Sequence, residues 1–240
     1  MATPAQVRAL TRTLAAVALT KARLAGLAGL GLLAVVVGFA IGAASPTLPT
    51  EAGADLVNAY GLTIMAPVVT LVVASATFGD CIEDNTLVYL WLRPIARSVL
   101  ATSAGVASFL TAAPAVIVPL AAAAALTGGG GDLVLGTVLA GALAVVGYVG
   151  LFVLLGLVSK RPLVWGVLYI LIWEGFIARA GTASSQFSVQ YYARSALAEL
   201  SGVGLTLGDA PFAAAILVPL GAMVLGLALA TARLRQLSVA

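Results

Sequence analysis

Residues 79–97 read GDCIEDNTLVYLWLRPIAR, and they form the only long segment that mixes acids, bases and a proline in an otherwise apolar chain. The acids come first and the bases last. This order suits a short helix, because carboxylates stabilise the N-terminal end of the helix dipole and guanidinium groups the C-terminal end. Asp80 and Glu83 have capping-box spacing, and Pro94 disfavours helical geometry at Arg93. The stretch therefore predicts a helix of about three turns between two membrane spans.

The predicted helix carries apolar and aromatic side chains, including Leu87, Tyr89, Leu90 and Trp91. An apolar helix at a membrane surface is stabilised when a protein partner covers it. The alternative is an amphipathic helix that caps its own helix bundle.

This stretch resembles the first cytoplasmic loop of ABC-2 type transporter permeases. In that family an acidic residue, a Thr-Leu pair, an apolar pair and an Arg-Pro-x-x-Arg ending form the coupling helix that contacts the ATPase. The resemblance implies ATPase contacts for Glu83, Thr86, Leu87, Leu90, Arg93, Pro94 and Arg97. Members of the family usually carry a lysine within the next turn or two. Residues 98–105 contain no base, so the basic contact is missing from the resemblance.

The composition indicates that lipid surrounds most of the chain. Of 240 residues, 62% are apolar and only 9% charged, whereas soluble domains carry roughly a quarter charged residues. The single cysteine, Cys81, excludes an intramolecular disulfide. The absence of histidine excludes zinc sites built from His and Cys, Ser-His-Asp triads and haem ligation by histidine.

The chain contains no Walker A pattern, because the glycines at 128–131 are followed by Asp132 and not by Lys and Ser or Thr. We therefore predict no catalytic, cofactor-binding or metal-binding residue in it. If ATP drives the protein, ATP and Mg²⁺ bind to a separate ATPase chain.

Six apolar segments are expected to cross the bilayer as helices, for which about 20 residues are needed. They cover residues 24–43, 57–78, 98–126, 133–158, 162–177 and 211–231. No internal repeat and no soluble domain is predicted, so residues 1–240 form one transmembrane domain.

The N-terminal segment places Leu10, Leu14 and Val17 on one helical face among basic residues. This pattern predicts an amphipathic helix at the inner membrane surface. A signal peptide is the competing interpretation, but the apolar stretch 24–43 is longer than a signal-peptide core, and more spans follow it.

The basic residues predict the orientation. All but two of the 12 Lys and Arg lie in the N-terminal segment, the 79–97 loop, the turn at 159–161 and the C-terminal segment. With six spans these four segments share one side, so both termini are predicted to be cytoplasmic, in a bacterial cell membrane. The bases are scattered in pairs near the membrane, which argues against a nucleic-acid partner.

Glu174 is the one ionisable residue predicted to lie deep within a span. It follows Arg161 by thirteen residues, or about 20 Å of helix, which places it in the outer half of the membrane, where a carboxylate is costly. A role in transport is one interpretation. The others are a structural ion pair with Arg179 or Arg194, or a protonated carboxyl bonded to a neighbouring helix. Arg194 is the better partner, because Arg179 is five residues away and off the same helical face.

Apolar and aromatic residues recur three or four positions apart between 178 and 209, which predicts short helices at the outer membrane interface. In ABC-2 permeases such extracellular helices follow the fifth span.

Together these features predict an all-α membrane protein. It would have six transmembrane helices, an N-terminal interfacial helix, a cytoplasmic coupling helix and short extracellular helices before the sixth span. The predicted function is the permease subunit of an ABC-2 exporter, paired with a second copy or a homologous permease and docked on two ATPase subunits. The main alternative is a stand-alone secondary transporter or small channel, which would carry paired charges on several spans. A membrane enzyme would instead cluster polar or acidic residues at one membrane face.

Overall fold

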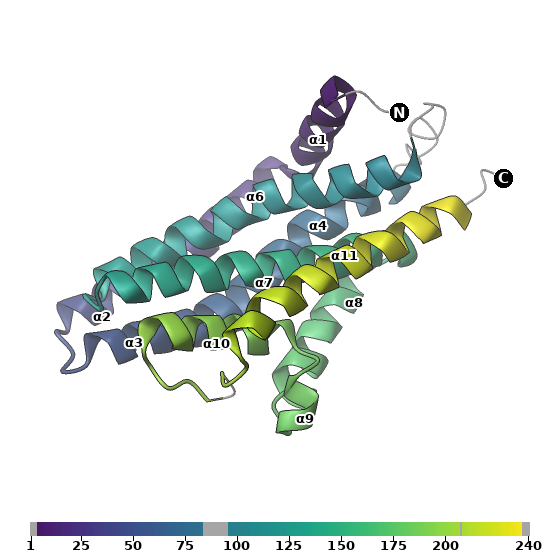
Figure 1. The fold of residues 1–240 in the computed structure, drawn as a ribbon. Coiled ribbons are helices and arrows are strands. Elements are labelled where there is room, and N and C mark those ends of the chain that lie inside the picture. The colour runs from purple at the N-terminus through teal and green to yellow at the C-terminus, as the bar shows by residue number, and fades with distance from the viewer. Residues whose placement is uncertain (1–3, 84–95, 207, 237–240) are drawn as a thin grey trace.

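The computed structural model describes residues 4–83, 96–206 and 208–236, and within these ranges every regular element is a helix (Figure 1). The predicted all-helical fold class is therefore confirmed. In chain order the elements, with η marking a π-helix, are α1 (Pro4–Ala18), α2 (Lys21–Ala43), α3 (Pro49–Leu56), η1 (Val57–Met65), α4 (Ala66–Glu83), α6 (Arg97–Leu126), α7 (Gly131–Val158), α8 (Pro162–Leu168), η2 (Tyr169–Ile177), α9 (Thr182–Ser185), α10 (Val189–Ser201) and α11 (Phe212–Gln236).

Five helical segments in the described part of the chain are long and apolar enough to cross a membrane. They are Lys21–Ala43, Pro49–Gly79, Arg97–Leu126, Gly131–Val158 and Phe212–Gln236. The remaining expected span, Pro162–Ile177, is apolar but shorter. Its length is about 24 Å at the rise of an α-helix, against about 30 Å of hydrocarbon. The multi-pass character is supported, and the count of six spans stays a prediction.

The helix that contains the expected span 57–78 extends beyond it at both ends. It begins at Pro49, in the first turn of α3, where a missing N–H costs nothing. It continues through Asp80 to Glu83 at the end of α4. The interpretation of Asp80 as the N-cap of a new helix is therefore wrong, because its backbone already belongs to α4.

The π-helix η1 lies directly before Pro67 in this long helix. Proline has no N–H to give to the carbonyl four residues back, and its ring clashes with that carbonyl, here that of Thr63. The wider turn of η1 relieves this clash. In it the N–H of Ala66 donates to the carbonyl five residues back, that of Gly61. The widened turn carries Thr63, which is central to the site described below.

The bundle has two distinct ends (Figure 1). The α2–α3 and α6–α7 loops meet at the end that we call the Gly128 end, where the Thr50 hydroxyl donates to the Gly129 carbonyl at 3.0 Å. At the other end, the Arg161 end, α4 finishes, α6 begins and α7 turns into α8. A small cavity there is lined by Arg23, Gly79 and Arg161, from α2, α4 and the α7–α8 turn.

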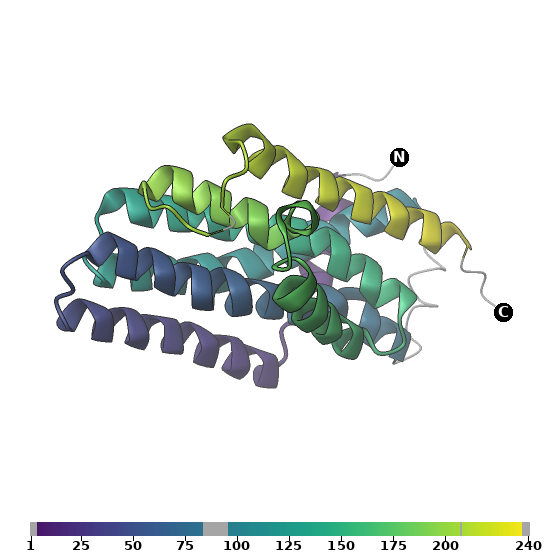
Figure 2. The ribbon, with the colours of Figure 1, turned by 90° about the horizontal axis from the view of Figure 1, so that it is seen from below.

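Helix α7 is the centre of the bundle, and it contacts α4, α6, α10 and α11. Glycines allow these helices to approach closely, as small residues do in membrane bundles. A Cβ atom on Gly156 would lie 2.7 Å from the Ser75 carbonyl oxygen on α4, and one on Gly150 would lie 2.6 Å from the Ala222 carbonyl oxygen on α11. Figure 2 shows α2 and α11 on opposite sides of the bundle, with α8, η2 and α9 in front.

Two short helical segments share one side of α7. Helices α8 and η2 cover the part nearer the Arg161 end, where the rings of Tyr169 and Phe152 meet edge to face at 6.2 Å. Helix α10 covers the part of α7 nearer the Gly128 end, where Val189 packs against Gly147 and Leu197 against Gly136. The chain is therefore broken in the middle of this side, between Ile177 and Val189, and the break is where polar side chains gather.

Helix α1 confirms the predicted amphipathic face in part. Leu10 and Leu14 are buried against the bundle, whereas Arg8 and Arg12 are exposed, and the side chain of Val17 lies outside the described set. The helix packs on α6 and α4.

Candidate functional site

Most of the predicted ATPase-coupling residues are outside the described part of the chain, which includes only Glu83 and Arg97 of the set. Glu83 ends α4 and Arg97 begins α6. Thr86, Leu87, Leu90, Arg93 and Pro94 fall within 84–95, outside the described part of the chain. Their role in docking stays a prediction. The structure places only the two ends of this segment, side by side at one end of the bundle (Figure 1).

Glu174 is buried at the break between η2 and α10, with 3% of its surface exposed. Its carboxyl group accepts three hydrogen bonds. The Ser188 hydroxyl donates to Oε2, the Val189 N–H donates to Oε1 at 3.2 Å, and the Tyr169 hydroxyl donates to Oε1 at 3.3 Å. An ionised carboxylate is an acceptor only, so it can take all three.

These partners place Glu174 at the N-terminus of α10. Ser188 is the N-cap of that helix, and its hydroxyl also accepts the N–H of Tyr191. Val189 is the first residue of the helix. An anion is stabilised at a helix N-terminus, because the first N–H groups have no partner within the helix and the dipole is positive there. Glu174 therefore joins the end of η2 to the start of α10.

The predicted ion pair between Glu174 and Arg194 is not formed. The hydrogen bonds of Glu174 go to Ser188, Val189 and Tyr169, whereas those of Arg194 and Arg179 go to Thr63. Of the structural alternatives, bonding to a neighbouring helix is found, but the carboxyl group accepts all three hydrogen bonds, whereas the sequence-based alternative was a protonated carboxyl. Arg194 lies on α10, six residues after the N-cap Ser188, and its Nη2 donates to Thr63 on η1.

Thr63 on η1 is the meeting point of three donor groups. The Nη2 atoms of Arg179 and Arg194 each lie 3.4 Å from its Oγ1, and the Gln190 side-chain amide donates to the same oxygen. The hydroxyl gives its own proton to the Asn58 carbonyl at 2.8 Å. A hydroxyl oxygen has two acceptor positions, so three donors share a group that can satisfy two.

Two positive charges are close together at this point. Because both Nη2 atoms lie 3.4 Å from one oxygen, they are less than about 7 Å apart and repel each other, although solvent screens the exposed charge of Arg179. Burial, and then the charge of Arg179, lower the pKa of Arg194, and the carboxylate of Glu174 opposes this shift. Arginine nevertheless remains charged.

Three buried polar atoms next to these groups lack a hydrogen-bond partner among the described residues. They are the Nε of Arg194, whose side chain is 6% exposed, the side-chain oxygen of Asn58 on η1, and the hydroxyl of the fully buried Tyr148 on α7. Buried polar groups without a partner are uncommon and call for an explanation.

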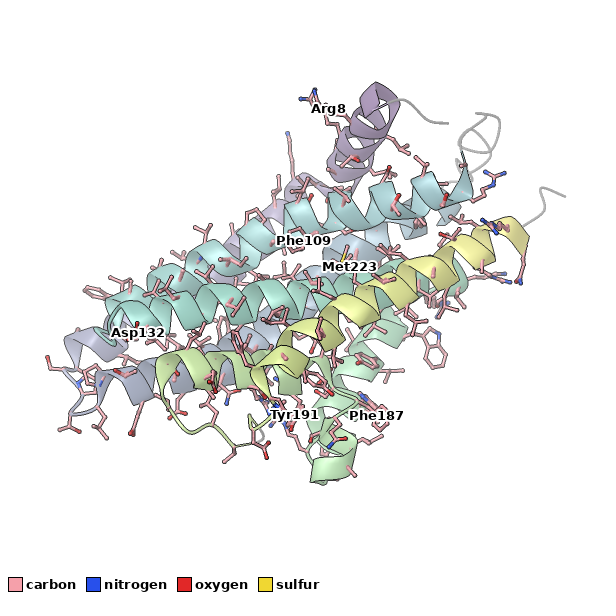
Figure 3. All side chains as sticks on the ribbon, viewed as in Figure 1. Arg8, Phe109, Asp132, Phe187, Tyr191 and Met223 are labelled. Atoms are coloured by element: carbon pink, nitrogen blue, oxygen red, sulfur yellow. The ribbon has the colours of Figure 1, made fainter. Side chains whose placement is uncertain are left out.

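Two cavities lie near Glu174, which lines the smaller one, whereas its hydrogen-bond partners Tyr169, Ser188 and Val189 line the larger. The smaller, of about 180 Å³, lies between η1–α4 and α8–η2, and its lining is Thr63, Glu174 and the apolar or small residues Ile64, Val68, Val167, Ile170, Leu171 and Gly175. The larger, of about 450 Å³, lies between α7, η2, α10 and α11 and is lined by Tyr169, Trp173, Phe187, Tyr192, the polar residues Gln186 and Ser188, and apolar side chains. Phe187 and Tyr191 mark this region in Figure 3.

The sequence singles out Glu174 and Arg194 but gives little sign of the residues that surround them. Thr63, Ser188 and Gln190 are common polar residues that carry no motif, and Tyr148 and Tyr169 have the pattern of ordinary packing residues. One signal was present, because Asn58 and Thr63 interrupt an apolar span just before Pro67. In the described residues no group of three or more His, Cys, Asp or Glu could hold a metal ion.

Comparison with models of known protein families and with curated proteins finds no match for this chain. The site offers the buried guanidinium group of Arg194, the exposed one of Arg179, a carboxylate held by a helix N-terminus, and two largely apolar cavities nearby.

Proposed function

We propose that this chain is the transmembrane subunit of an ATP-driven exporter of the ABC-2 type. It moves its substrate by alternating access, while a separate chain hydrolyses ATP. Two copies, or one copy and a homologous permease, pair around the pathway and dock on two ATPase subunits through residues 79–97.

The observation that carries this proposal is the position of the ends of that segment. Glu83 at the end of α4 and Arg97 at the start of α6 lie at the Arg161 end. The basic turn between α7 and α8 and the C-terminal arginines of α11 lie at the same end. By the positive-inside rule this end faces the cytoplasm, where an ATPase is found. Helices α9 and α10 before α11 also fit the family pattern.

The packing of α4 and α6 suits a lever that transmits force from an ATPase. The hydroxyl groups of Thr77 on α4 and Ser108 on α6 are 3.0 Å apart in the buried interior. Both helices also pack on α7. A push on the segment between them would therefore move the two helices as a pair and change their packing on α7.

The first prediction tests docking. The protein is purified with a tag from its own host membrane, and the co-purifying chain with a Walker A motif is quantified. Leu87→Asp is expected to lower its recovery roughly a hundredfold, because losing a buried leucine at an interface costs about 3 kcal/mol. Leu48→Asp is the matched control, since Leu48 is exposed at the opposite end of the bundle. Equal recovery of the ATPase by both variants would show that residues 79–97 do not dock it.

The second prediction tests orientation. In a Cys81→Ser background, single cysteines at Thr47 and Ala183 are expected to react with a membrane-impermeant thiol reagent added to intact cells. Cysteines at Ala96 and Gln236 are expected to react only after lysis. All four positions are exposed, so accessibility to solvent does not limit labelling. Labelling of Ala96→Cys from outside would contradict cytoplasmic placement of the Arg161 end.

A stand-alone secondary transporter is the second candidate, and the break between η2 and α10 favours it. Secondary transporters bind their substrates at interrupted helices, with half-helix N-termini directed at charged groups. The docking experiment separates the two candidates. Transport by the purified chain in vesicles without any ATPase, driven by an ion gradient, would establish this alternative.

A further inference from the structure

The cluster around Thr63 has more hydrogen-bond donors than acceptors, even when the side-chain oxygen of Asn58 is counted, a buried acceptor that has no partner among the described residues. The Thr63 hydroxyl donates its proton to the Asn58 carbonyl. Its two acceptor positions face three donors, from Arg179, Gln190 and Arg194. Arg194, with 94% of its surface buried, also keeps an Nε–H with no acceptor among the described residues. An additional acceptor oxygen at this point would satisfy groups that the described part of the chain leaves unsatisfied.

The charge of the cluster points to an anion. Two guanidinium groups face one hydroxyl, and the carboxylate of Glu174 already accepts three hydrogen bonds from Ser188, Val189 and Tyr169. The cluster of Arg179, Arg194 and Glu174 therefore has one positive charge in excess. Guanidinium groups bind phosphate and carboxylate oxygens through parallel N–H bonds, which makes two neighbouring arginines a good match for a phosphate group.

The cavity beside Thr63 indicates what is attached to the anion. Apart from Thr63 and Glu174 its lining is apolar or glycine. Ile64 and Leu171 on its walls are 45% and 56% exposed, so in a membrane the cavity opens towards lipid between η1 and η2. Arg179 at the end of η2 is exposed, and a ligand can reach it without unfolding of the site. A free inorganic anion would leave this apolar cavity unfilled. A lipid would place its phosphate at the arginines and its hydrocarbon chain in the cavity.

We propose that Arg179, Gln190 and Arg194 bind the phosphate group of a lipid whose hydrocarbon chain enters the cavity between η1–α4 and α8–η2. The ligand bridges the two halves of the broken side of α7, because Arg179 follows η2 and Arg194 lies on α10. This site is independent of the ATPase partner, and it would exist equally in an exporter or in a secondary transporter.

The test uses the purified full-length chain in dodecyl maltoside and measures binding by thermal shift and native mass spectrometry. The probe is dodecyl phosphate, which has one phosphate and one chain. Inorganic phosphate supplies the head alone, and dodecyltrimethylammonium supplies the chain with the opposite charge. We expect dodecyl phosphate to bind and to raise the melting temperature, since a ligand of the folded state stabilises it. The other two compounds are expected to have little effect at the same concentration.

Arg179→Gln is the principal variant, because its exposed side chain is not needed for the core. It is expected to weaken dodecyl phosphate binding about tenfold or more, as the loss of a charge-assisted hydrogen bond does. Arg235→Gln, which changes an exposed arginine at the Arg161 end, is the matched control and is expected to bind as the parent does. Equal binding by Arg179→Gln and Arg235→Gln would overturn the proposal.

Two further variants separate the head from the chain. A Cβ atom on Gly175 meets nothing closer than 3.6 Å, so Gly175→Leu fills the cavity without displacing backbone and is expected to weaken dodecyl phosphate binding. Thr63→Val removes the competing acceptor and leaves the arginines free, and binding is expected to be kept or strengthened. Binding of inorganic phosphate as tight as that of dodecyl phosphate, unchanged in Gly175→Leu, would reduce the site to an ion site and overturn the lipid assignment.

Discussion

Replacing Gly226 with leucine is expected to separate α11 from α7 and to lower the melting temperature of the purified protein by about 10 °C. A Cβ atom at this position would lie 2.3 Å from the carbonyl oxygen of Gly150 and 2.7 Å from its Cα. These are backbone atoms of a buried helix, and they cannot rotate aside. Overpacking of side chains usually costs about 1–3 kcal/mol, and here two helix axes must move apart. We therefore expect a cost of about 3 kcal/mol or more, which corresponds to that shift in melting temperature for a chain of this size.

Gly221→Leu is the matched control on the same helix. Gly221 is exposed, and a Cβ atom there meets nothing within 4 Å. It introduces the same side chain with the same gain in helix propensity, so it should leave the melting temperature unchanged or raise it slightly. The melting temperature of both variants is measured by heating and then monitoring the loss of folded protein by size-exclusion chromatography. Equal melting temperatures would show that close packing at Gly226 does not hold α11 against α7.

Removing the carboxyl group of Glu174 is expected to detach α10 from η2. Glu174→Ala leaves the buried donors of Ser188 and Val189, and that of Tyr169, without their acceptor. An unsatisfied buried donor costs about 1–3 kcal/mol, so the total loss is expected to be about 3 kcal/mol or more. The melting temperature should fall by about 10 °C, and hydrogen exchange at the N-terminus of α10 should become faster.

Two controls show whether the hydrogen bonds are responsible. Glu174→Gln keeps the acceptor oxygen that serves Val189 and Tyr169, and it should lose less than half as much stability as Glu174→Ala. Glu199→Ala removes an exposed carboxylate from the same helix and should have little effect. If Glu174→Gln kept the parent melting temperature but abolished substrate-stimulated ATP hydrolysis in the reconstituted complex, Glu174 would act in transport. Parent stability in Glu174→Ala would contradict the structural role.

Composition and periodicity were sufficient for the helical class and for the approximate positions of the apolar helices. The reason is that these properties are local. A run of about 20 apolar residues must satisfy its backbone internally in lipid, and a helix is the way a single segment can do so. Local rules failed at the ends of the helices. The expected span begins at residue 57, yet Pro49 starts a helix that continues through the polar residues Glu51 and Asp55 into the apolar stretch.

The sequence also determined that Glu174 needs a partner, since a carboxylate in an apolar segment is costly wherever the chain folds. Only the tertiary structure decided which partner it has. Arg194 is the better partner by charge. The fold, however, places the N-terminus of α10 next to η2, so that Ser188 and Val189 donate to the carboxylate. Thr63 and Arg194 are 131 positions apart, and no local pattern could bring them together. Their contact depends on how η1, η2 and α10 pack on α7, which is set by the glycines that allow the helices to approach.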